Sequence, residues 1–446
     1  MKKAIPIIKN HITLTPYRFY NEFLYEVATS YIGKEMPIEF NLIDGNDDNV
    51  YGKKYSIDPI TIPLLLSLTE QFSKLYKTPV KLNQNLMTDP LVDLLEFLYS
   101  GDFFYLAGNN KKSPFPIGRC ILEFNWFPFK DFEEEKYNVE HKVRAFSLDD
   151  KTRYDSELTI RGALSKSNIK NDELKRNFLI EETSYKIDDY FYDLLHYNDN
   201  EFTSNQTNFF INILAELITN GIWHSGSDVY AMMFVNRFGT RFSISDNGIG
   251  AKSLSLKKDF LYKNKELFDI LEKVQMPFSL PPAIKTNLLM IFEMLFYSMI
   301  KKREGLFDLM SNVVLDGNGY FRLHTERSQI IISKRMESYL SKLRDIRQQI
   351  RDCYDKIQDT ETQMNKKDIS DRENQNQIEQ MQSVVYEENR KLSNIIKNSQ
   401  NTFKSFYADT INKHNADVMY SSVRFYGVKF NGIHIEVEIP NPNPNF

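Results

Sequence analysis

The sequence predicts a mixed α/β (α+β) protein, and three observations lead to that prediction. In the first 130 residues, short runs of strand character alternate with longer helical segments. Residues 209–224 form an amphipathic helical pattern, and two alternating runs follow it up to residue 246. From residue 333 to residue 420 no proline or glycine occurs, as expected of long helices. We therefore expect a small α/β domain, an α/β sandwich domain and a helical insertion.

The first part of the chain, residues 1–130, predicts the small α/β domain. In order, we expect a strand start and a helix at 12–31, a strand at 37–44, a helix at 60–76, a strand at 80–83 and a helix at 90–99. Alternation of elements with these lengths is typical of a layered fold.

Residues 131–200 have a mixed, highly charged pattern. They include an acidic cluster at 133–135 and a basic pair, Lys175 and Arg176. Such runs usually form solvated surface. We expect a connector with local helices here and assign it no chemistry.

The helix predicted around residues 209–224 carries a polar stripe beside a buried one. Its apolar positions recur at steps of three and four: Phe209, Phe210, Ile213, Leu214, Leu217 and Ile218. Its polar positions recur every four residues, so they lie nearly above one another: Asn212, Glu216, Asn220 and His224. The Glu216 carboxylate can accept a proton from water, and the Asn220 amide oxygen is a hard ligand of the kind that Mg²⁺ takes. We expect His224 to pack at the helix end; contact with the site is the alternative.

The next segment predicts a β-hairpin that ends in a glycine-bearing turn. Residues 229–235 and 241–246 are expected strands, so Asp246 lies at a strand end. A carboxylate there can accept the exocyclic amine proton of adenine. Gly248 and Gly250 allow a close backbone approach beside a flat base.

These two motifs resemble those of the GHKL ATPases, the family named for gyrase, the heat-shock chaperone, histidine kinases and the MutL proteins. Glu216 and Asn220 match its N box, which implies a general base and a Mg²⁺ ligand, respectively. Asp246, Gly248 and Gly250 match its G1 box, which implies an adenine reader. The resemblance implies a Bergerat-type α/β sandwich that binds ATP and Mg²⁺.

The resemblance continues downstream, with two departures. Residues 304–314 resemble the G2 loop and its helix, but Gly305 is the only glycine where relatives usually have two. Lys301, Lys302 and Arg303 are the candidate phosphate partners beside it. Residues 432–440 resemble the closing strand, and Ile433 stands where relatives often carry threonine. ATP binding is therefore a firmer expectation than hydrolysis, although Glu216 is retained.

The resemblance also sets the domain limits. The ATP-binding domain is expected to comprise residues 201–333 and 418–446. Residues 251–287 occupy the position of the ATP lid in relatives, and a mobile cover and a fixed loop are both open interpretations.

Residues 334–417 predict an antiparallel coiled-coil arm inserted before the closing strand. Apolar residues recur at three and four before and after a polar break at 366–374: Leu340, Leu343, Ile346, Ile350, Tyr354, Ile357, then Ile378, Met381, Val385, Leu392 and Ile395. A projecting hairpin buries little of itself, which favours an arm that binds a protein partner or a second copy. An extended strut without a ligand is the alternative.

The first 130 residues also resemble, in pattern only, the STAS-type modules that accompany some kinase-like ATPases. Residues 44–51 offer no serine where such modules carry a phosphoacceptor. Phosphorylation within the chain is therefore not expected there.

Composition limits the class of protein. The formal net charge of −4 and the pI of about 6.1 give no global basic field, so nucleic acid is not indicated, while a local patch stays open. Cys120 and Cys353 are far apart in sequence, the usage of a reducing compartment. The N-terminus lacks the apolar core of a signal peptide, and Glu293 interrupts the most apolar run, 288–300. We expect a cytoplasmic protein that does not use a membrane.

The leading functional expectation is an ATP-binding protein with Mg²⁺-dependent ATPase activity, acting as a nucleotide-controlled switch in a bacterial signalling or defence assembly. A histidine or anti-sigma serine protein kinase is the second hypothesis. His141 and His196 lack the acidic residue that usually follows a phosphoacceptor histidine. A scaffold that only binds ATP is the third.

Overall fold

The computed structural model describes two compact units. The first comprises Met1–Leu254, Phe321–Gln329 and Phe425–Phe446, and the second comprises Ser255–Tyr320 and Ile330–Arg424. Within these limits the structure describes residues 4–31, 37–45, 52–83, 89–108, 118–125, 140–166, 172–195, 204–225, 227–248, 265–365, 372–413 and 421–440.

The first unit begins with a parallel sheet in the order β1-β3-β5-β6. Its strands are β1 (Ile5–Ile8), β3 (Glu39–Ile43), β5 (Val80–Asn83) and β6 (Leu122–Glu123). Two short strands, β2 (Thr13–Leu14) and β4 (Ser56–Ile57), pair separately. The helical elements between the strands are α1 (Pro16–Arg18), η1 (Phe19–Phe23), α2 (Leu24–Tyr31), η3 (Pro59–Thr61), α3 (Ile62–Tyr76), α4 (Asp89–Ser100) and α5 (Phe103–Ala107). The alternation predicted for this region is present.

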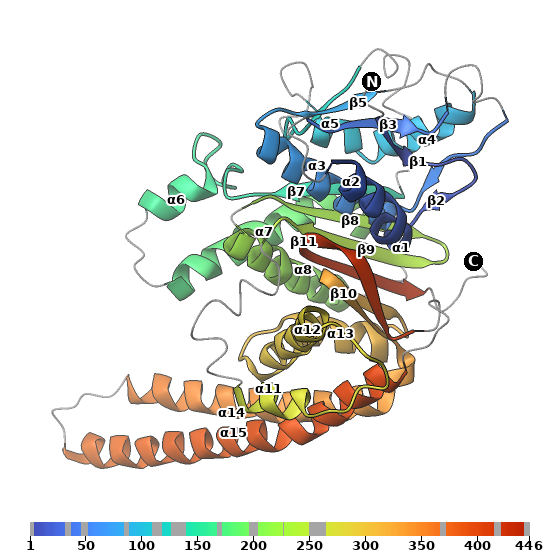
Figure 1. Ribbon diagram of the computed structural model, residues 1–446. Helices are drawn as coiled ribbons and strands as arrows, with labels where there is room; N and C mark the ends of the chain where they lie inside the picture. The colour runs from blue at the N-terminus through green and yellow to red at the C-terminus, as the bar shows by residue number, and fades with distance from the viewer. Residues whose placement is uncertain are drawn as a thin grey trace. The chain divides into compact units, whose positions relative to one another are not determined.

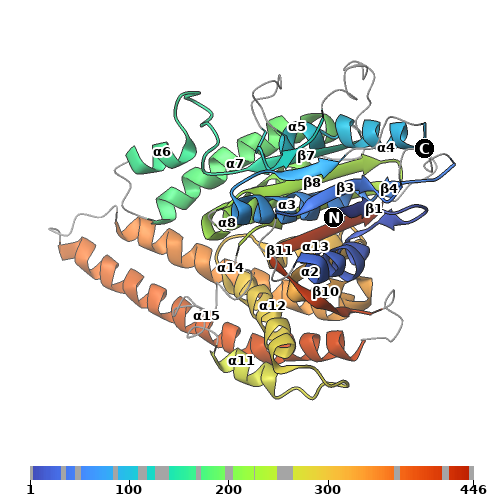
Figure 2. The same ribbon diagram turned by 45° about the horizontal axis from the view of Figure 1, so that its top comes forward.

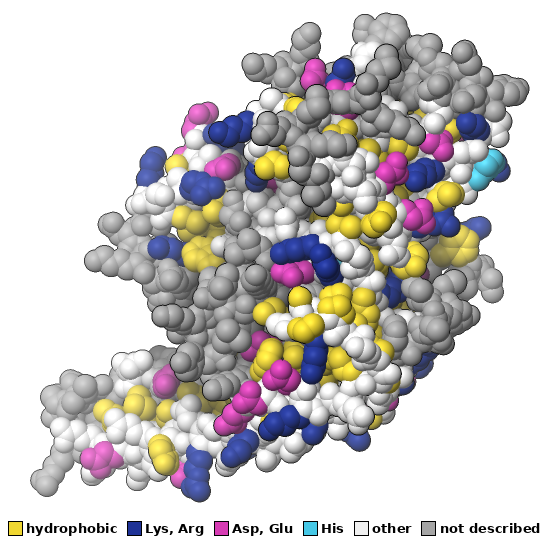
Figure 3. Space-filling view, viewed as in Figure 1, with side chains coloured by type: hydrophobic (Ala, Val, Ile, Leu, Met, Phe, Trp, Pro, Cys, Tyr) yellow, Lys and Arg dark blue, Asp and Glu magenta, His cyan; other side chains and the backbone are white. Residues whose placement is uncertain are grey.

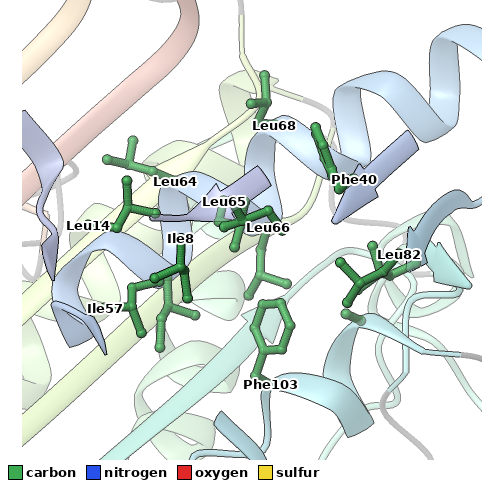
Figure 4. Close-up of a cluster of buried hydrophobic side chains, with 14 of the residues drawn as sticks. Ile8, Leu14, Phe40, Ile57, Leu64, Leu65, Leu66, Leu68, Leu82 and Phe103 are labelled. Atoms are coloured by element: carbon green, nitrogen blue, oxygen red, sulfur yellow. The ribbon is translucent and has the colours of Figure 1, made fainter. Parts of the chain in front are cut away.

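Local sequence explains how the long helix of this region starts and stops. Asp58 accepts a hydrogen bond from the Ile60 backbone N–H at the start of η3, where Pro59 stands at the first helical position, and α3 continues directly from η3. The helix ends at Lys77, which takes a left-handed conformation. Leu64, Leu65, Leu66 and Leu68 of α3 lie in one buried cluster with Phe40, Leu82 and Phe103 (Figure 4).

An antiparallel sheet forms the other half of the first unit, in the order β10-β11-β9-β8-β7. Its strands are β7 (His141–Phe146), β8 (Val229–Asn236), β9 (Gly239–Asp246), β10 (Tyr320–Ile332) and β11 (Val423–Pro440). Strands β8 and β9 form the predicted hairpin, and Asp246 pairs with Val229 across it. Strand β7 was not predicted; it lies in the region that we expected to be a connector.

Both faces of this sheet are covered within the first unit. Tyr230 and Met232 of β8 share a core with the N-terminal residues, whereas Val229, on the opposite face, meets α8 (Ser204–Ser225) at Gly221. Helix α8 packs against α7 (Asp172–Leu195), and a short helix α6 (Ile160–Lys166) precedes them. Figures 1 and 2 show α7 and α8 on one side of the sheet and α3 on the other. A parallel and an antiparallel sheet in one chain confirm the mixed α/β class.

The second unit is helical. It contains α11 (Lys265–Glu272), α12 (Pro282–Ile300), α13 (Leu306–Leu315), η6 (Lys334–Met336), α14 (Glu337–Met364) and α15 (Arg372–Asn412). Helices α14 and α15 pack side by side around Ile350, Cys353 and Leu392 (Figure 1). Figure 3 shows charged side chains of both signs over this helix pair. The two long helices are thus present ahead of β11; a coiled-coil register for them stays a prediction.

Helix α12 is the most apolar of the long helices. Among the described residues it alone is long and apolar enough to cross a membrane, and 61% of that stretch is buried inside the structure. Core helices of soluble proteins have the same character. Phe292 and Phe296 of α12 pack edge-to-face against Phe403 of α15, as in a helical core.

Candidate functional site

Helix α8 holds Glu216 and Asn220, the two residues that resemble an N box, at the edge of its buried face. The side chains from Ile213 to Ile222 are buried apart from Asn220, which is half-buried. Glu216 is only 7% exposed. A carboxylate at that depth needs a partner, because an unpaired buried charge is costly.

The partner of Glu216 is Arg176 of α7. One guanidinium nitrogen, Nη2, donates to Glu216 Oε1 and to Asn220 Oδ1, the latter at 2.7 Å. A guanidinium only donates, so the amide of Asn220 must turn its oxygen toward this point. The oxygens of the predicted base and the predicted metal ligand therefore converge on one positive charge.

Arg176 was missed by the sequence analysis, which treated it as solvated surface. Its side chain is 18% exposed. The spacing of three and four residues could have indicated a buried position for Arg176. It places Arg176 on the helix face that carries the buried α7 side chains Leu179, Thr183, Ile187 and Leu194. A charged residue on that stripe must find a buried counter-charge.

The predicted adenine reader, Asp246, lies at the end of β9. Its Oδ1 accepts hydrogen bonds from the backbone N–H of Gly248 at 2.7 Å and of Ile433 at 3.3 Å. Within the described part of the chain, no hydrogen bond is made to its other oxygen, Oδ2. Burial raises the pKa of this carboxyl from 3.8 to about 6, although the two N–H groups act to lower it. Asp246 is therefore mostly ionised at neutral pH, with one oxygen available as an acceptor.

Two glycines allow the backbone and helix α8 to approach Asp246. Gly432 of β11 has φ +107°, and a Cβ there would lie 1.9 Å from the Asp246 carbonyl oxygen. A Cβ on Gly221 of α8 would lie 2.7 Å from Val229 and 3.6 Å from the Cβ of Asp246. Elements from three distant parts of the chain, α8, β9 and β11, thus meet at one carboxylate.

The N-terminal part of the chain also reaches this turn. Asn247 donates to Glu70 of α3, and Gln71 Nε2 donates to Asn247 Oδ1 at 2.9 Å and to the Asn431 carbonyl at 3.0 Å. Burial, followed by the nearby Asp228 charge, raises the pKa of Glu70. No local sequence pattern predicts these contacts, because they join residues 176 or more positions apart.

The remaining candidate residues belong to the second unit and form the turn between α12 and α13. Arg347 of α14 is buried and donates to the carbonyls of Met299, Lys301 and Arg303, the first at 3.0 Å and the last at 2.5 Å. It also pairs with Asp308 at 3.1 Å.

The N-terminus of α13 is capped from within this turn. Gly305 donates its N–H to Asp308 at 3.0 Å, and Phe307 donates to Ser298 at 3.0 Å. The side chain of Lys301 lies over the Tyr297 ring at 4.2 Å, and that of Lys302 binds Gln358. The turn is therefore held in a fixed shape by α14.

Several predictions lie outside the described residues. They are Gly250, the first part of the segment compared with an ATP lid (249–264), most of residues 44–51, His196 and the polar break at 366–371. His224 belongs to α8, but its side chain is also outside them. The structure brings Glu216, Asn220, Asp246 and Gly248 into the first unit, and Lys301, Lys302, Arg303 and Gly305 into the second.

His141, considered above as a phosphoacceptor, lies at the start of β7. Its side chain is buried, stacks on Phe97 with ring centroids 4.0 Å apart and binds the Phe97 carbonyl at 2.7 Å. Burial lowers its pKa. A histidine held in this way is poorly placed to receive a phosphoryl group.

The side chains around α8 and β9 include oxygens whose chemistry bears on the predicted metal and nucleotide. Glu216 and Asn220 direct two oxygens, both of the hard kind that Mg²⁺ prefers, at the point where the Arg176 guanidinium lies. Asp246 offers a buried acceptor that suits an exocyclic amine.

Comparison of the chain with protein-family models, with curated proteins and with solved structures finds no match.

Proposed function

We propose that this chain binds ATP with Mg²⁺ at the meeting point of α8, β9 and β11 and hydrolyses it. The observation that carries the proposal is the convergence on Asp246: Gly221 and Gly432 bring α8 and β11 against it, and Oδ1 is fixed by two backbone N–H groups. Burial of a carboxylate lowers the stability of the folded protein, and a role in ligand binding accounts for its presence at this position.

On the adenine side, Asp246 Oδ2 would accept a hydrogen bond from the exocyclic amine. Guanine presents a carbonyl oxygen at the same position and would face the carboxylate with like partial charge. The N–H groups of Gly248 and Ile433 keep Oδ1 occupied, which leaves Oδ2 to read the base. Preference for ATP over GTP follows.

On the phosphate side, Asn220 and Glu216 would hold the metal and the attacking water. Bound Mg²⁺ would supply Lewis-acid stabilisation of the phosphate charge. Glu216 Oε1 would accept the water proton as general base, and the Asn220 oxygen would serve as a metal ligand.

The proposed output is a nucleotide-controlled switch in a cytoplasmic bacterial signalling or defence assembly. The helix pair α14 and α15 would act as the arm that binds a protein partner or a second copy.

Phosphate release and label transfer from γ-labelled ATP test this proposal. Glu216→Gln should lower turnover about 100-fold or more while ATP still binds, because general-base catalysis is worth about that much. Glu181→Gln on the exposed face of α7 is the matched control and should keep wild-type turnover. Label retained on the protein would instead support a kinase, and binding without turnover would support a scaffold.

A further inference from the structure

We propose that Arg176 is an internal cation that occupies the metal position of the ligand-free site and is expelled when metal and nucleotide bind. This inference rests on the proposed function, since it concerns the Asn220 oxygen that would bind Mg²⁺ and the Glu216 oxygen that would accept the water proton. It adds a competitor, located on α7, to the residues that hold the ion.

The geometry makes the two cations mutually exclusive. Arg176 Nη2 donates hydrogen bonds to both Glu216 Oε1 and Asn220 Oδ1, so it covers the Asn220 oxygen that Mg²⁺ would need at about 2.1 Å and the Glu216 oxygen that would accept the proton of water. A guanidinium and a divalent ion would also repel each other at that separation. Metal binding therefore requires the guanidinium to leave.

The position of Arg176 in its helix allows that exit. It lies in the second turn of α7, which begins at Asp172. Two turns further on, Thr183 binds Thr219 of α8 at 3.3 Å, and Leu179 is fully buried. The body of α7 can stay docked on α8 while the long Arg176 side chain swings away.

The consequence is a site that is neutralised when it is empty. Arg176 cancels the charge of Glu216, which otherwise would be buried without a partner. The contact of Arg176 with Glu216 and Asn220 also raises the metal concentration at which the site is half-saturated. Nucleotide binding would release the first turns of α7, so α7 reports whether the site is filled.

Manganese titration of ATP binding tests this competition, with free Mn²⁺ followed by electron paramagnetic resonance. Arg176→Met keeps the apolar stem without the charge, and Arg176→Gln is a second neutral variant. Both should reach half-saturation at about tenfold lower Mn²⁺ than the wild type, since a charge-assisted hydrogen bond is worth at least a factor of ten. Lys175→Met removes the same charge one residue away and should leave the requirement unchanged.

Amide hydrogen exchange provides a readout that does not depend on turnover. In the wild type, exchange in residues 172–178 should rise when Mn²⁺ and ATP bind, because the contact that anchors this turn is lost. In Arg176→Met it should already be fast and should change little. This measurement on the wild type carries the test even if neither variant folds.

Two failures can be told apart. If wild type and variants bind ATP with the same Mn²⁺ requirement, or the variants need more metal, Arg176 is not a competitor and the inference is wrong while the proposed function stands. If neither the wild type nor the variants bind ATP at any Mn²⁺ concentration, both the proposed function and this inference are wrong.

Discussion

Replacing Asp246 with asparagine should make the ligand-free protein more stable at neutral pH while it weakens ATP binding. The carboxyl has a pKa of about 6 in the folded chain, against an ordinary value of 3.8. A raised pKa means that folding favours the protonated form. The stability contributed by the neutral carboxyl is complete below pH 3.8 and is lost as the pH rises through about 6.

The size of the effect follows from these two pKa values. Each tenfold change in the acid constant corresponds to about 1.4 kcal/mol, so the ionised carboxylate costs about 3 kcal/mol at pH 7.5 and about 1 kcal/mol at pH 4.5. Asparagine at position 246 keeps an oxygen for the N–H groups of Gly248 and Ile433 and carries no charge. The free energy of unfolding of Asp246→Asn should therefore exceed that of the wild type by most of the cost of the ionised carboxylate at each pH.

Urea denaturation followed by circular dichroism at the two pH values measures the difference directly. The stability gap between Asp246→Asn and the wild type should be about 3 kcal/mol at pH 7.5 and should narrow by about 2 kcal/mol at pH 4.5. Asp189→Asn, an exposed change on α7, is the control and should show no such gap. A variant less stable than the wild type at pH 7.5, or a gap independent of pH, would refute the reasoning.

Three further predictions concern single side chains. Gly432→Ala should lower the free energy of unfolding by several kcal/mol and weaken ATP binding in a calorimetric titration, because its Cβ would collide with the Asp246 carbonyl. Gly427→Ala in the same strand is the control, since its Cβ would meet nothing within 4 Å and the change should be neutral. Glu293→Met should stabilise the protein by about 3 kcal/mol more at pH 8 than at pH 4.5, as measured by thermal unfolding. Burial raises the Glu293 pKa to about 7, so the wild type loses stability as the pH rises through that value. Equal stabilisation at both pH values would contradict this prediction. Arg347→Met should destabilise the second unit by about 3 kcal/mol in urea denaturation. The reason is that three carbonyls lose the Arg347 donor and the buried Asp308 carboxylate loses one guanidinium partner while it keeps another, Arg351. A change below about 1 kcal/mol would contradict this.

The elements around the site could be predicted because their patterns are local. The buried stripe of α8 and the alternation of β8 and β9 each repeat within a few residues, so the helix, the hairpin and the place of Asp246 at the strand end follow from the sequence. The parallel strands and helices of the N-terminal region were found for the same reason.

The parts that could not be predicted depend on contacts between distant residues. Strand β7 is recognisable only through its pairing with β8, and Gln71 reaches Asn247 only after the N-terminal region packs on the sheet. Arg347 binds carbonyls 44 to 48 residues away, for which no sequence spacing gives a signal. Arg176 could have been found, because its place on the buried face of α7 already demanded a counter-charge.

Calorimetric titration of the wild-type protein with ATP and GTP in the presence of Mg²⁺ tests the central claim most directly. We predict one ATP bound per chain, GTP binding at least about tenfold weaker, and a loss of about tenfold or more in ATP affinity in Asp246→Asn, since one charge-assisted hydrogen bond is removed. Equal affinities for ATP and GTP, or an unchanged ATP affinity in Asp246→Asn, would contradict the assignment of Asp246 as the residue that reads adenine.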